Sequence, residues 1–194
     1  MKSNKARNIL KPLYYRVDQE IGSMAKVCTK GCFFCCYQPI EIFSIEKATL
    51  GEFIQKELNN ETKQAIKENT LKWLDYFDEN TPSREPLSSK DAFGDFRFKA
   101  ENIPIPCPLL INGECSVYKA RPLNCRTHIV NDDKKLCEQD KLRNGTPASM
   151  DIRNEAVAKL KAEGAIEIIP LTYALVEILK IDRKTKKIEK TLLK

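Results

Sequence analysis

Histidine and glycine are both scarce in this chain of 194 residues, and each scarcity excludes a kind of site. His128 is the single histidine, so a metal site built from several imidazoles cannot form. Among the seven glycines, no two have the spacing of a dinucleotide- or nucleotide-binding phosphate loop. The sequence therefore predicts neither a multi-histidine metal site nor a glycine-rich cofactor cradle.

Long apolar runs are also lacking. No window reaches the roughly 18 apolar residues that a transmembrane helix requires. The most apolar stretch, 166–181, is interrupted by Glu167, Pro170, Glu177 and Lys180. Residues 1–11 are polar and basic, and no apolar segment of a secretory signal follows them. We therefore expect a cytoplasmic protein without membrane contact, in a compartment where thiols stay reduced.

Basic residues outnumber acidic ones by 33 to 27, which gives a formal charge of +6. That value treats thiols as neutral. If all eight were thiolates holding two divalent ions, eight negative and four positive charges would change the total to +2. Nucleic acid is therefore not expected as a partner. Part of the basic excess lies in a C-terminal tail, 183–194, whose simplest interpretation is a solvated segment and whose alternative is a contact for an acidic partner.

Apolar residues recur at helical spacing over most of the chain. Helices are predicted over 6–26, 44–58, 60–77, 146–163 and 171–180. Ser44, Asn60 and Thr146 are their predicted N-caps, and Gly164 is a predicted helix stop. Prolines and serines between 80 and 106 indicate an irregular connection that includes a packed part or a short strand. The expected fold is mainly α, a single helical domain over 1–194 with an irregular cysteine-rich segment.

Four of the eight cysteines fall within nine residues, at Cys28, Cys32, Cys35 and Cys36. On an α-helix they would lie within an arc of about 100° and point into one pocket. Such a helix would rise about 12 Å over this distance. Zinc binds each sulfur at about 2.3 Å, so the four thiols of a helix cannot all reach one ion. Either Gly31 breaks the helix and turns the ligands inward, or ligands from elsewhere join them.

The other four cysteines are Cys107, Cys115, Cys125 and Cys137. The turn signal Asn112-Gly113 lets the chain double back and bring the first two of these thiols to one ion. Four plus four thiols can make two tetrahedral sites, or one cluster with spare thiols. Thiolate-rich sites select zinc or iron–sulfur chemistry over calcium or magnesium. The spacing matches neither a zinc ribbon nor a bacterial ferredoxin run.

Each of these residue types also has a structural alternative. Eight is an even number, so structural disulfides are one alternative, and small apolar core residues are another. Lys119, Arg121 and Arg126 could offset thiolate charge, or form surface salt bridges. His128, three residues after Cys125, is a further candidate ligand or a structural side chain.

The cysteine pattern resembles that of the YkgJ-type cysteine-cluster family. The matching elements are Cys28-x3-Cys32-x2-Cys35-Cys36, Cys107-Pro-x-Leu and Cys115-x2-Tyr118-x2-Arg121-Pro122-x2-Cys125-Arg126. The resemblance covers a cysteine-cluster region of about 28–137 and implies a zinc- or iron-chelating domain typified by eight cysteines. Seven of the cysteines in this chain match family cysteines by their position in these motifs. Cys137 matches less firmly, because no motif surrounds it. His128 stands where the family often has an aromatic residue.

The sequence thus predicts a metal-binding protein that holds an iron–sulfur cluster or zinc through up to eight cysteine thiolates. The adjacent pair Cys35–Cys36 is awkward for one tetrahedral ion and favours iron–sulfur. One alternative is an iron–sulfur enzyme of redox or group transfer, since the flagellin lysine methylases are similar in their cysteines. This chain is short for that role and has no glycine-rich methyl-donor loop. Acid–base candidates near the cysteines are Asp95, Glu101, Asp132 and Asp133. The other alternative is a metal-scaffolded interaction module.

Overall fold

The computed structural model describes residues 3–29, 31–80, 105–140, 143–165, 167–182 and 191–192. Within these ranges the fold is mainly helical, which confirms the expected fold class. The α-helices are α1 (Ser3–Ser23), α2 (Glu46–Glu57), α3 (Asn60–Asn80), α5 (Leu123–Thr127), α6 (Lys134–Gln139), α7 (Pro147–Ala162) and α8 (Leu171–Leu179). Two short 3₁₀ helices, η1 (Phe34–Tyr37) and η2 (Tyr118–Ala120), lie in the cysteine-rich region.

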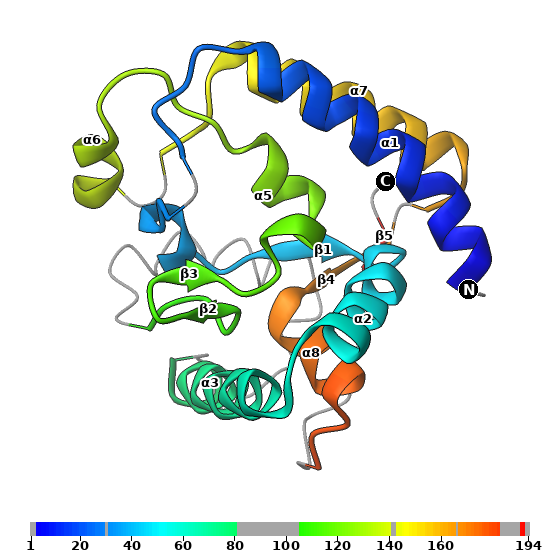
Figure 1. The fold of residues 1–194 in the computed structure, drawn as a ribbon, viewed down its shortest axis with the longest axis vertical. Helices are drawn as coiled ribbons and strands as arrows, with labels where there is room; N and C mark the ends of the chain where they lie inside the picture. Colours follow the sequence, from blue (N-terminus) through cyan, green and yellow to red (C-terminus); the bar gives the residue numbers. More distant parts are fainter. Residues whose placement is uncertain are drawn as a thin grey trace.

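A small antiparallel sheet, which the sequence analysis did not predict, joins an N-terminal part of the chain to its C-terminal part. Its strands are β1 (Glu41–Phe43), β4 (Glu167–Pro170) and β5 (Thr191–Leu192), in the order β1-β4-β5. Ile42 stands opposite Ile169, and both side chains are buried. The sheet therefore fixes the chain directly after the first cysteine group against the strand that leads into α8 (Figure 1).

Two apolar cores flank the cysteine-rich region. In Figure 1, α1 and α7 run side by side and α5 lies beneath them, and these three helices enclose one core that contains Leu123. The other core lies among β1, α2 and α8 and includes Cys107 itself. Cys28 packs against the first core, and Cys36 and Cys115 pack against the second. These cysteines therefore lie between the two apolar cores rather than on an exposed loop.

Helix ends agree with the predicted caps in some places and differ in others. The Thr146 side chain accepts a hydrogen bond from the Ser149 N–H at 3.2 Å, as expected of an N-cap. Ser44 and Asn60 are not caps, and those predictions were wrong. Ile45 precedes α2 without a side-chain cap bond, and the Asn59 side chain accepts from the Thr62 N–H at 2.8 Å instead.

Two predicted segments fall largely outside the described residues. Of the irregular connection 80–106, only its two ends are described, and of the basic tail 183–194, only the two residues of β5 are described. No helix in the described part of the chain has both the length and the apolar character needed to cross a membrane.

A tight hairpin follows Cys107, as the Asn112-Gly113 turn signal predicted. Strands β2 (Leu110–Ile111) and β3 (Glu114–Cys115) pair antiparallel, with Leu110 opposite Cys115. The two turn residues have φ values of 52° and 78°. Positive φ at both central positions defines the turn type that suits the twist of paired strands.

We expect Gly113→Ala to lower the free energy of unfolding by about 1 kcal/mol, because an L-residue at positive φ is strained. An added Cβ at Gly113 meets no atom within 4 Å, so the backbone conformation alone is tested. Gly22→Ala is the matched control, since its Cβ also meets nothing but the residue is helical. That change is expected to raise stability by about 0.5 kcal/mol. Urea unfolding measures both, and equal effects would contradict the turn assignment.

Candidate metal centre

The first cysteine segment is not an α-helix within its described residues. Gly31 has φ 89°, a conformation that an α-helix does not contain. This agrees with the first of the two alternatives above, in which Gly31 interrupts a helix. The Cys32 N–H donates to the Thr29 carbonyl at 3.0 Å, and only residues 34–37 form a single 3₁₀ turn. This local path turns the thiols inward instead of spacing them along one helical face.

A direct backbone bond joins the two cysteine segments. The Cys107 N–H donates to the Cys36 carbonyl at 2.5 Å. Just before it, the indole N–H of Trp73 donates to the Pro106 carbonyl at 2.6 Å, which ties this point of the chain to α3. The β2–β3 hairpin then returns Cys115 toward Cys107, and α5 presents Cys125. Two stretches about 70 residues apart in sequence therefore meet around one space.

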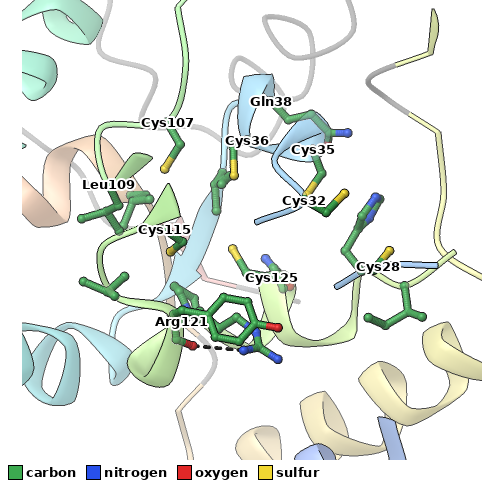
Figure 2. A pocket seen from close by; sticks show the side chains of 18 of the residues that line it. Cys28, Cys32, Cys35, Cys36, Gln38, Cys107, Leu109, Cys115, Arg121 and Cys125 are labelled. Atoms are coloured by element: carbon green, nitrogen blue, oxygen red, sulfur yellow. Dashed lines mark hydrogen bonds between the residues drawn. The ribbon is translucent and has the colours of Figure 1, made fainter. Parts of the chain in front are cut away.

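Seven thiols line a cavity of about 180 Å³. They are Cys28, Cys32, Cys35, Cys36, Cys107, Cys115 and Cys125, and Figure 2 shows how they lie around it. His128 and Arg121 also line the cavity. Among the described residues, no three His, Cys, Asp or Glu side chains are grouped as they would be around one metal ion. The sulfur atoms surround the cavity rather than converge on a single point.

Cys137 lies apart from the lining of this cavity. It is a buried residue of α6, and α6 packs against η1. The Arg143 guanidinium lies 3.8 Å from its sulfur and forms an ion pair with Asp132 at 2.5 Å. The Asp133 side chain caps α6 by accepting from the Lys135 N–H. These two acidic residues are therefore engaged in holding α6. The other acid–base candidates, Asp95 and Glu101, lie outside the described residues.

The thiols are held where negative charge is poorly solvated. Burial raises the pKa of Cys107 to about 12, and charge on Cys115 adds to the effect. Burial likewise raises the pKa of Cys125, and charge on Cys107 adds to that shift. Burial also raises the pKa of Cys115, although the Arg121 guanidinium opposes this. A set of thiolates in this cavity therefore requires compensating positive charge.

The donor set suits a thiophilic metal. Seven sulfur atoms and the one imidazole of His128 line the cavity. Sulfur ligands of this kind select zinc or iron–sulfur centres, and a bound cation provides the charge that buried thiolates need. The residues present therefore fit either of the two metals that the sequence indicated.

Arg126 is a buried positioning residue rather than a surface ion-pair partner. Its side chain is 4% exposed. The guanidinium donates to both carboxylate oxygens of Asp18 at 2.8 and 2.5 Å, and to the carbonyls of Arg121 and Lys119 at 2.7 Å each. It also lies over the Tyr14 ring, with Cζ 4.1 Å from the centroid. These contacts fix the loop before Cys125 onto α1.

Glu46 completes the support of α5 from the other side. One carboxylate oxygen accepts from the Leu123 N–H at 2.7 Å and from the Tyr14 hydroxyl, and the other accepts from the Phe43 N–H at 2.9 Å. The side chain is 1% exposed. The sequence analysis missed this residue, although a signal exists. Glu46 stands four and eight residues before the buried Leu50 and Ile54, on the face that helical spacing assigns to the core.

We expect Glu46→Gln to lower the free energy of unfolding by about 1–3 kcal/mol, because an amide has one acceptor oxygen where three donors converge. Tyr14→Phe removes a single donor and is expected to lower it by about 1 kcal/mol. Urea unfolding at neutral pH measures both variants. A Glu46→Gln protein as stable as the unchanged chain would show that the carboxylate does not hold α5 in place.

A family model matches residues 27–145, a span that contains all eight cysteines and more than half of the chain. The family is CxxCxxCC, described as “Putative zinc- or iron-chelating domain”. No curated protein and no solved structure shows a significant match to the chain. The match agrees with the resemblance that the cysteine motifs indicated. The chain belongs to the CxxCxxCC family, whose description names zinc or iron as the bound metal.

Proposed function

We propose that this protein carries a thiolate-ligated metal centre in the cysteine-lined cavity, and that iron and inorganic sulfide form it. The observation that carries the proposal is the ring of seven thiols from two remote segments around about 180 Å³ of space. A lining so rich in sulfur suits a thiophilic metal centre rather than a site for calcium or magnesium.

The spread of the sulfur atoms favours an iron–sulfur core over a single ion. In a tetrahedral zinc site with Zn–S bonds of about 2.3 Å, neighbouring sulfurs stand about 3.8 Å apart. No three Cys, His, Asp or Glu side chains in the described ranges are gathered in that way. An iron–sulfur core contains several metal and sulfide atoms and takes four cysteines at its periphery, so its ligands stand farther apart. Zinc is the second candidate, since a sulfur-only donor set also suits it.

Metal binding would also stabilise the fold of this region. Among the described residues between 24 and 40, η1 is the one regular element, and the hairpin and α5 are short. A shared metal centre would connect these pieces, and a structural zinc contributes on the order of 10 kcal/mol in small domains. The bond between Cys107 and Cys36 and the contacts of Arg126 and Glu46 bring the proposed ligands near one another.

The proposal is tested on protein purified without oxygen, by measuring iron, zinc and acid-labile sulfide per chain and recording the visible spectrum. We expect iron and sulfide in equal amounts and broad charge-transfer absorbance. Zinc without sulfide in a colourless protein would instead support the second candidate. Protein that carries neither metal, and takes up neither on reconstitution, would reject the proposal.

Single-thiol variants test whether both cysteine segments contribute. Cys35→Ser and Cys115→Ser are each expected to lower the metal content by at least half and to lower the melting temperature, because a hydroxyl is a poor ligand for either metal. Thr29→Ala is the matched control, since Thr29 lines the same cavity but offers no thiolate. Unchanged metal stoichiometry in both cysteine variants would contradict the proposed ligation.

A further inference from the structure

The thiols around the cavity are divided into two sets in space, and the division does not follow the sequence. Figure 2 shows Cys36, Cys107, Cys115 and Cys125 together on one side. Cys28, Cys32 and Cys35 lie together on the other side. Cys36 thus leaves its sequence neighbours and joins the three cysteines that follow more than 70 residues later.

Apart from those of Cys35, whose charge acts on thiols of both sides, the charge interactions between the thiols agree with this view. Charge on Cys107, Cys35 and Cys125 acts on the Cys36 thiol. Charge on Cys107, Cys35 and Cys115 acts on the Cys125 thiol. On the opposite side, the Cys28 thiol is influenced by charge on Cys32. Each set is therefore close enough internally for its members to interact.

Cys137 joins the side that holds Cys28 and Cys32. Helix α6 packs against η1, which places its buried Cys137 next to the first cysteine segment. Charge on Cys32 and Cys35 acts on the Cys137 thiol, and charge on Cys137 acts on Cys28. This contact supplies a fourth sulfur for a side that otherwise has three.

The local backbone explains why two adjacent cysteines separate. Cys35 and Cys36 lie within the 3₁₀ turn η1. With three residues per turn, adjacent side chains of such a helix point about 120° apart. Cys35 lies at the border of the two sides, since its thiol contacts that of Cys36 and its charge acts on members of both. The adjacent cysteines can therefore supply one ligand to each of two neighbouring metal centres.

We propose, on the basis of the proposed function, that the eight thiols ligate two metal centres. The first thiol group is Cys28, Cys32, Cys35 and Cys137, and the second thiol group is Cys36, Cys107, Cys115 and Cys125. Four thiolates complete either a tetrahedral zinc site or the cysteine shell of an iron–sulfur cluster. Each group combines cysteines from both ends of the cysteine-rich region, so neither centre can form from one sequence segment alone.

Three double variants test this division. Cys32→Ser with Cys137→Ser damages only the first thiol group, and Cys36→Ser with Cys115→Ser damages only the second. Each of these is expected to keep half of the unchanged protein's metal. Cys32→Ser with Cys36→Ser, two changes only four residues apart, damages both groups and is expected to bring the metal content to background. Iron and zinc per chain are measured after anaerobic reconstitution with ferrous iron and sulfide, or with zinc alone.

Two results would overturn the division. Equal loss in all three double variants would indicate one shared centre. Half of the metal retained in the Cys32/Cys36 pair, with full loss in the other two pairs, would show that the groups follow the sequence. In contrast, an unchanged protein that binds no metal at all would refute the proposed function itself, so the two failures are distinguishable.

A second measurement uses the unchanged protein, so the proposal can still be tested if the variants fail to fold. Metal-free reduced protein is loaded with zinc below saturation and alkylated, and unmodified thiols are mapped by mass spectrometry. Chains with one zinc are expected to retain four unmodified thiols of a single group, and saturation is expected at two zinc ions per chain. Saturation at one zinc per chain, or unmodified sets that mix the two groups, would overturn the proposal.

Discussion

Negative charge collected in a buried cavity must be offset by positive charge, and this constraint governs the cysteine-rich half of the molecule. Burial holds the pKa of Cys107 and of Cys125 above the ordinary thiol value, and each thiolate would raise the pKa of its neighbours further. Seven thiols around one cavity are therefore hard to explain as ordinary core residues. A bound metal cation makes the deprotonated thiols favourable, because its positive charge offsets their negative charge. The cluster of sulfur atoms that disfavours bare thiolates therefore attracts the metal.

The rest of the fold serves to bring these sulfurs together from distant parts of the chain. Two apolar cores stand on either side of the cavity and fix the helices that border it. Between them, buried polar groups rather than regular structure hold the loops. Arg126 attaches the loop before Cys125 to α1, and Glu46 binds the Leu123 N–H at the start of α5 and the Phe43 N–H at the end of β1. Each of these contacts orients a thiol without contacting the cavity's sulfur atoms.

Local sequence signals predicted the features that depend on neighbouring residues. The Thr146 cap and the Asn112-Gly113 turn were identified because their chemistry acts within a few residues. Strands β1 and β4 were missed because segments of only three and four residues form strands here by pairing with each other, and Ile42 and its partner Ile169 are 127 residues apart in the sequence. The sequence allowed two sites of four thiols, but it did not indicate the division of the cysteines that we propose. That division depends on the 3₁₀ turn at Cys35–Cys36 and on the packing of α6, neither of which has a local signature.

The central claim is that the cavity's sulfur atoms bind metal directly. X-ray absorption spectroscopy at the iron and zinc edges, on protein purified without oxygen, tests this most directly. We predict a first coordination shell made of sulfur, with metal–sulfur distances of about 2.3 Å. A first shell dominated by nitrogen or oxygen would contradict the account, because it would place the metal away from the thiols that line the cavity.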